Sequence, residues 1–217
     1  MSNGFLLSPS KSDAMWIGTQ AQLAAMSKPF ADLCISDTPI VPSQSIKIVG
    51  VTLDQQLKFS QHVTDVCRAA NYHLRALSHI RRFLDIMSAK LLATSIVEAK
   101  VDYCNSLFTG LNDHDLQRLQ RVQNRAARIV TNSRGTVSSG PLLRELHWLP
   151  VPNRIDYKIA RLTFKALTNC QPPYLNSLLI PYQPTRSLRS SSSHLLTVPH
   201  VTTAFQSRAF SSFAPRL

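Results

Sequence analysis

The chain has 217 residues, of which 44% are hydrophobic, and its 24 lysine and arginine residues against 12 acidic residues give a formal net charge of +12. This apolar content suffices for a folded core and excludes a wholly disordered chain. No secretory leader is recognisable, and no segment approaches the roughly 20 apolar residues of a membrane helix, so we expect an intracellular protein of the cytoplasm or nucleus without membrane contact. The cationic excess favours a polyanionic partner, nucleic acid first and an anionic membrane surface second.

Short strands are predicted near the amino terminus, where runs of β-branched or aromatic residues are bounded by Pro, Ser, Asp and Gly. These runs span residues 14–19, 33–36 and 45–53. From about residue 60 to 169 the apolar residues have helical spacing, and Ser60 and Ser88 are candidate caps of the first two helices.

The predicted fold class is therefore α+β and mainly α, with a small antiparallel strand remnant, a bundle of about four helices and an extended basic tail. We expect three domains, at residues 1–58, 59–170 and 171–217. Composition leaves open whether the tail, which is rich in Pro and Ser, is disordered or wraps around the helices.

The third and fourth predicted helices each carry a stripe of cations, because basic residues recur there at spacings of three and four. At about 100° per residue, each set shares one helix face. Two such stripes without acidic neighbours at i,i+4 favour contact with backbone phosphates, and a merely solvated face is the alternative. The residues are Arg118, Arg121, Arg125 and Arg128 in the third helix, and Arg154, Lys158, Arg161 and Lys165 in the fourth.

The sequence contains no recognisable catalytic set. Metal-dependent nucleotidyl transfer needs converging carboxylates, and no adjacent aspartate pair occurs. The acidic cluster at residues 113–115 starts a helix, which favours a capping role, and Asp65, Asp85, Glu98 and Asp102 are expected to be caps or local ion pairs. No zinc or nucleophile motif is present. We therefore expect no catalytic residue, no metal and no cofactor, and no enzyme activity of this chain alone.

Several blocks of the sequence occur in the order found in one polymerase family. Residues 7–13 and 16–19 resemble the segment after the catalytic aspartates in reverse transcriptases of LINE-type (non-LTR) retrotransposons, Jockey-like or a related clade. Residues 48–54 are similar to the strand and turn at the primer grip of that family. Further blocks resemble its thumb and post-thumb helices and its tail, at residues 99–105, 119–128, 146–151, 186–190 and 208–211.

The resemblance implies the carboxyl-terminal part of such an enzyme, comprising the end of the palm, the thumb and the tail, after the catalytic aspartates. Lys11 would be only a remnant of a lysine that assists the leaving pyrophosphate, and Val49, Gly50 and Val51 would be primer-grip-like. The implied function is binding of RNA or an RNA–DNA duplex through backbone phosphates, with the missing palm as a further partner. The alternative is a non-catalytic helical interaction protein, or a retroelement relic without selected activity.

Overall fold

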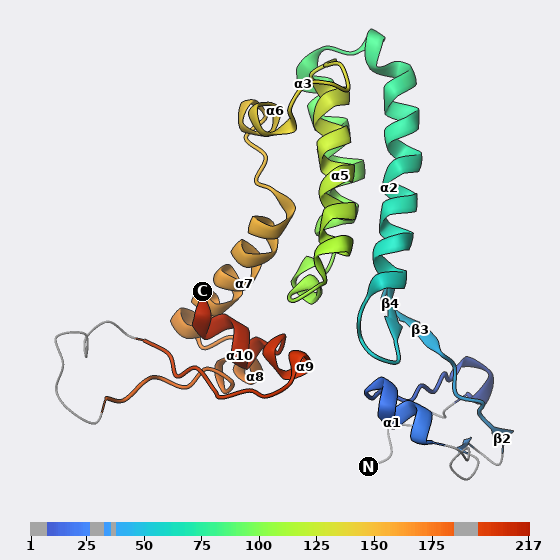
Figure 1. The fold of residues 1–217 in the computed structure, drawn as a ribbon, viewed down its shortest axis with the longest axis vertical. Helices are drawn as coiled ribbons and strands as arrows, with labels where there is room; N and C mark the ends of the chain where they lie inside the picture. Colours follow the sequence, from blue (N-terminus) through green and yellow to red (C-terminus); the bar gives the residue numbers. More distant parts are fainter. Residues whose placement is uncertain (1–7, 27–32, 36–37, 185–194) are drawn as a thin grey trace. The chain divides into compact units, whose positions relative to one another are not determined.

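A computed structural model of the chain describes residues 8–26, 33–35, 38–184 and 195–217 (Figure 1). Its contacts divide it into two compact units, Met1–Asp65 and Val66–Leu217. Helices predominate, and the described strands form two antiparallel pairs, so the predicted α+β, mainly α fold is confirmed. The three predicted domains stay a prediction, and the block at residues 186–190 lies outside the described residues.

The first unit contains a β-hairpin in place of the single strand predicted over residues 45–53. Strand β3 (Ser45–Ile48) pairs with β4 (Val51–Asp54), with Ile48 opposite Val51. The turn residues between them, Val49 and Gly50, have φ of 47° and 80°. Positive φ at both positions is typical of type I′ hairpin turns, and Gly50 adopts it without steric cost. The glycine thus reverses the chain in the middle of an apolar run.

The remaining elements of the first unit are short. Strands β1 (Cys34–Ile35) and β2 (Thr38–Pro39) form a second antiparallel pair. The 3₁₀ turn η1 spans Pro9–Lys11, and helix α1 (Gln20–Ala25) begins with a capping box between Thr19 and Gln22. The strand predicted over residues 14–19 is wrong, because this segment forms no ladder with any described strand and leads into the cap of α1.

Helix α2 (Ser60–Ile80) begins one residue earlier than predicted, with Ser60 as its first residue rather than its cap. Asp54 prepares this start, since its carboxylate accepts hydrogen bonds from the backbone N–H groups of Gln56, Lys58 and Phe59 at 3.1, 3.0 and 2.7 Å. An acidic side chain that collects several N–H groups before a helix satisfies donors that would otherwise lack a partner.

The second unit is a helical bundle that continues from α2 through the turn η2 (Arg81–Phe83). A composite helix follows, made of α3 (Ile86–Leu92), the π-helical turn η3 (Ala93–Glu98) and α4 (Ala99–Asp102). Its N-cap is Asp85, whose carboxylate accepts from the Ser88 N–H at 3.0 Å, so the predicted cap at Ser88 is wrong by one turn. The turn η4 (Asn105–Phe108) ends this segment.

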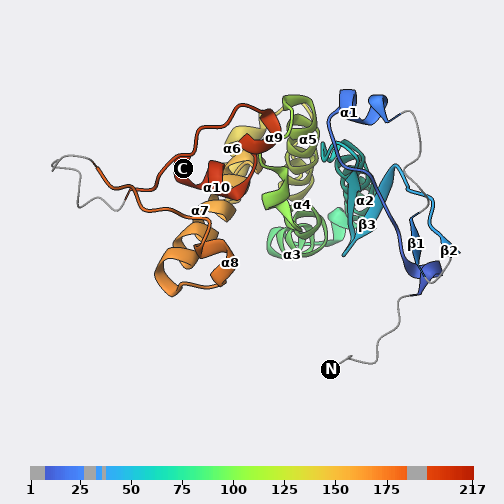
Figure 2. The same cartoon turned by 90° about the horizontal axis from the view of Figure 1, so that it is seen from below.

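Three more helices complete the bundle: α5 (Asp113–Val130), α6 (Ser139–Glu145) and α7 (Val151–Asn169). Their apolar stripes recur every three or four residues and meet in one core. Fully buried side chains of this core are Leu74, Ala93, Val97, Val101, Phe108, Leu119 and Val130. Figure 1 shows α5 beside α2, and Figure 2, from below, agrees.

Parts of the predicted tail pack on the bundle. The chain forms the short helices α8 (Pro173–Asn176), α9 (Ala204–Ser207) and α10 (Phe210–Phe213) and the turn η5 (Ala214–Arg216). Leu179, Ser212 and Ala214 are buried, and α10 lies beside α7 (Figure 2). A Cβ atom on Gly110, which has φ of 68°, would lie 2.6 Å from Cγ of Arg208, so the tail lies close against this turn. The described tail residues thus favour wrapping over disorder.

Candidate nucleic-acid interface

The four predicted arginines of α5 share one side of that helix. Their spacing of three, four and three residues places them within an arc of about 80°. The adjoining side is buried because apolar residues recur there at the same period, including Leu119, Val122, Ala126 and Val130. The shared face is therefore as predicted, while its role in binding stays a prediction.

These arginines differ in what they contact. Arg118 forms an ion pair with buried Asp115 at 3.1 Å, and only 26% of its side chain is exposed. Arg125 Nη1 donates to Asn71 Oδ1 at 3.0 Å, and Arg128 Nε donates to the Val137 carbonyl at 3.2 Å. Arg121 is exposed and forms no hydrogen bond or ion pair with a described residue. Arg121 and Arg125 therefore present the most accessible charge, and Arg118 has a structural role.

Helix α2 extends this cationic surface, which sequence reasoning missed. The bond from Arg125 shows that Asn71 lies on the side of α2 that borders α5. Arg68 and Arg75 lie three residues before and four after Asn71, hence on the same side, and both are exposed. We call Arg68, Arg75, Arg121 and Arg125 the α2–α5 basic face. The spacing on α2 was visible in the sequence, but the side on which α5 packs was not.

Three acidic residues of the helical unit are paired with arginines outside this face. Asp115 and Glu98 are 2% and 1% exposed, and each is paired with an arginine. Asp102 is also paired, with its Oδ2 2.7 Å from Nη2 of Arg154. These three acids are therefore paired with Arg118 and Arg154. Asp65 precedes Arg68 by three residues on α2 and so borders the basic face on that helix.

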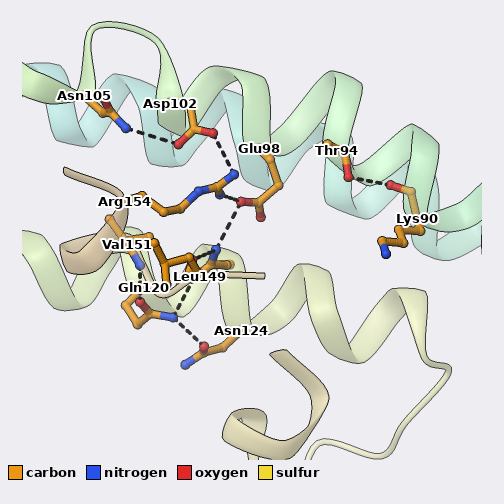
Figure 3. A network of polar contacts seen from close by, with 11 residues as sticks. Lys90, Thr94, Glu98, Asp102, Asn105, Gln120, Asn124, Leu149, Val151 and Arg154 are labelled. Carbon is orange, nitrogen blue, oxygen red and sulfur yellow. Dashed lines mark hydrogen bonds and ion pairs between the residues drawn. The ribbon is translucent and has the colours of Figure 1, made fainter. Parts of the chain in front are cut away.

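Arg154 differs from the other cations of the predicted α7 stripe, because it points between Glu98 and Asp102 (Figure 3). Only 20% of its side chain is exposed. The placement of Arg154 in an exposed stripe is thus corrected: it joins α7 to the composite helix. The expectation that Glu98 forms a local pair or cap is wrong as well, since its partner is 56 residues away.

A polar network surrounds this ion pair (Figure 3). Gln123 Nε2 donates to Glu98 Oε2 at 3.2 Å and to the Leu149 carbonyl at 3.0 Å, and Gln120 Oε1 accepts from the Val151 N–H at 2.9 Å. Burial raises the pKa of Glu98, and Arg154 and Gln123 act against this rise. Among the described residues, Glu98 Oε1 has no hydrogen-bond partner. The network fixes the start of α7 against α5 and η3.

The other cations of the α7 stripe, Lys158, Arg161 and Lys165, are exposed. Beside the first of them lies a cleft of about 380 Å³. Its walls combine aromatic, amide and charged side chains, a composition suited to a planar polar ligand. The residues lining it are Asp102, Asn105, His147, Trp148, Leu149, Arg154, Tyr157 and Lys158.

The predicted residues of the first unit have different accessibility. Val49 is 79% exposed at the hairpin turn, next to Gly50, but Val51 is 5% exposed and belongs to the core. Lys11 is exposed in η1. Of the three residues predicted to be primer-grip-like, Val49 and Gly50 at the turn therefore remain candidates. The Val51 side chain is not accessible to a ligand.

The part of the chain that the structure describes shows neither a metal-binding cluster nor a membrane-spanning helix. There is no group of three or more His, Cys, Asp or Glu residues that could hold a metal ion. Among the described helices, none has the length and apolar character needed to cross a bilayer.

Comparison with known proteins gives one informative match. The chain is 26% identical over 132 residues to a protein of Drosophila melanogaster named "Probable RNA-directed DNA polymerase from transposon X-element". The alignment covers 58% of this chain and 14% of that protein, so the chain spans a small part of its relative. No protein-family model and no solved structure matches the chain. The chain is thus distantly related to a retrotransposon RNA-directed DNA polymerase.

Proposed function

We propose that the chain is a nucleic-acid-binding segment of a non-LTR retrotransposon reverse transcriptase, equivalent to its carboxyl-terminal thumb region, and that it holds an RNA–DNA primer–template duplex by the phosphate backbone. The observation that carries the proposal is the α2–α5 basic face, on which Arg68, Arg75, Arg121 and Arg125 are exposed together. The relative supports the substrate class, since an RNA-directed DNA polymerase acts on RNA and DNA strands.

Helices suit this task because they hold guanidinium groups at fixed intervals along a rigid surface. Arginine binds phosphate oxygens through paired N–H donors, and such contacts fix the position of a duplex without reading its sequence. We therefore assign the face to sequence-independent binding. The exposed turn at Val49 and Gly50 is the primer-grip-like element of the proposal, which assigns no catalytic residue to the chain.

The test is a titration of the full chain against a labelled RNA–DNA hybrid at several salt concentrations, followed by fluorescence anisotropy. With about four phosphates neutralised, the logarithm of affinity falls by about 0.9 per phosphate for each decade of salt, which is roughly a hundredfold loss between 50 and 200 mM. A salt slope near zero contradicts the proposal.

A charge reversal identifies the face. Arg121→Glu with Arg125→Glu should abolish hybrid binding, while the matched reversal Lys100→Glu with Arg144→Glu, at exposed positions on α4 and α6, keeps most of it. Both variants change the net charge equally, and circular dichroism checks that both fold. Equal losses in the two variants would show that total charge rather than this face binds the duplex, and would favour the interaction-protein alternative.

A further inference from the structure

The outward side of α7 carries exposed aromatic rings among cations. Tyr157 and Phe164 are 62% and 68% exposed, although large apolar side chains on a helix are usually buried. The opposite side of α7 already packs into the core through Ile155, Ile159 and Ala166. The two rings are thus left on the surface by a helix whose core contacts are complete.

The cations of α7 lie next to these rings. Arg161 lies four residues after Tyr157 and three before Phe164, at spacings that place all three side chains on neighbouring parts of one face. Lys158 and Lys165 each follow one ring by one residue and are exposed on the same flank. Alternating rings and cations are the composition of surfaces that bind single strands, where bases stack on rings and phosphates meet cations.

This composition separates α7 from the α2–α5 basic face. In a duplex both faces of each base are covered by neighbouring bases, so an exposed protein ring can stack only on an unpaired base. Helix α5 contains no Phe, Tyr or Trp from Asp113 to Val130, so its arginines offer backbone contacts alone. On α2 a single exposed ring, Tyr72, lies among the cations of the basic face, whereas α7 carries two exposed rings. Helix α7 is therefore the surface better suited to several unpaired bases.

The distance between the rings also favours an extended single strand. Seven residues of helix rise about 10.5 Å, whereas stacked bases follow one another at about 3.4 Å. The rings therefore cannot hold adjacent bases of one stack, and they fit bases separated along an unstacked strand, with Arg161 between them for the backbone. Tyr157 and Lys158 also line the cleft beside α7. A base at one end of the bound strand can enter this cleft.

We propose that α7 binds single-stranded nucleic acid, with unpaired bases stacked on Tyr157 and Phe164 and phosphates bound by Lys158, Arg161 and Lys165. The inference rests on the proposed function, because it adds the unpaired template to the duplex held by the α2–α5 basic face. The charge of this surface favours single-stranded nucleic acid over an apolar protein partner. An apolar partner would offer no negative charge to the three cations Lys158, Arg161 and Lys165.

The experiment compares oligo(U) RNA, a flexible strand, with the RNA–DNA hybrid on the full chain. Phe164→Leu and Tyr157→Leu keep an apolar side chain and remove the ring, and each should weaken oligo(U) binding about tenfold. Tyr157→Phe keeps the ring and should restore affinity. Phe83→Leu, at a ring that is 74% exposed on η2, is the matched control and should change nothing.

The outcomes distinguish this inference from the proposed function. Both proposals are supported by two results together. Hybrid binding is lost in Arg121→Glu with Arg125→Glu but kept in Phe164→Leu, and oligo(U) binding is kept in the first variant but lost in the second. The α7 inference alone is overturned if the chain binds the hybrid and both Phe164→Leu and Tyr157→Leu bind oligo(U) as tightly as the parent chain. A chain that binds oligo(U) through the rings but no hybrid contradicts the duplex proposal instead, and a chain that binds neither overturns both.

Discussion

Replacing Arg154 by Met should strongly destabilise the helical unit. The substitution keeps an unbranched apolar stem but removes the guanidinium, and it leaves Glu98, which is 1% exposed, as a buried carboxylate without its cation. Breaking a buried ion pair from one side typically costs 3–5 kcal/mol, and because 20% of the Arg154 side chain is exposed we expect the lower end, about 3 kcal/mol. Loss of the contact to Asp102, which is 35% exposed, adds little.

The assay is urea unfolding followed by circular dichroism at pH 7.5 and pH 5. Burial already raises the pKa of Glu98 above its usual 4.5, and removal of Arg154 raises it further. A carboxyl whose pKa is higher in the folded state makes folding more favourable as pH falls towards the unfolded value. The deficit of Arg154→Met should therefore shrink at pH 5.

A second variant separates the charge from the packing. Glu98→Met together with Arg154→Met removes both charges and should recover most of the lost stability, because well-packed apolar pairs often replace buried ion pairs without loss. A loss below about 1 kcal/mol for Arg154→Met, or a double variant no more stable than the single one, would refute the description of Glu98 as a buried anion that depends on Arg154.

Three further perturbations test local features. Asn112→Ala removes the N-cap of α5, whose side chain accepts from the Asp115 N–H at 2.8 Å, and should lower the unfolding free energy by about 1 kcal/mol in a urea titration; an unchanged midpoint contradicts this. Val49→Asn places a residue that tolerates positive φ before Gly50 and should raise the melting temperature; a decrease would argue against the turn. Burial lowers the pKa of His62 below 6.5, so stability should fall as pH drops below 6.5, and His62→Gln should flatten this dependence in unfolding curves at pH 7.5 and 5.5.

The face of a helix could be predicted from the sequence because helical period fixes which side chains share it. The arginines of α5 and the cations of α7 follow this rule. The partner of each cation could not be predicted in the same way, since Arg154 and Lys158 occupy equivalent positions in the pattern. Only the fold brings Glu98 within reach of Arg154, across 56 residues.

The strands and tail were harder to predict because their signals are local and weak. The apolar run over residues 45–53 has strand composition throughout, and the reversal within it depends on positive φ at two residues, Val49 and Gly50, of which only the glycine signals a turn. The helices of the tail that the structure describes span only four residues each, too few for a periodic pattern to appear. Among them α10 buries one residue, Ser212, and α8 and α9 bury none, so no apolar stripe marks these helices in the sequence.

Arg81 also makes contacts that its charge alone does not indicate. Its guanidinium donates to the carbonyls of Ile129, Val130 and Leu84 at distances of 2.7 to 3.0 Å, so it closes the carboxyl end of α5. A lysine cannot reproduce this planar set of donors. In relatives of this chain, we expect arginine and lysine to exchange at Arg121, while Arg81 stays arginine. The pattern of exchange then distinguishes cations that stabilise the fold from cations that face a ligand.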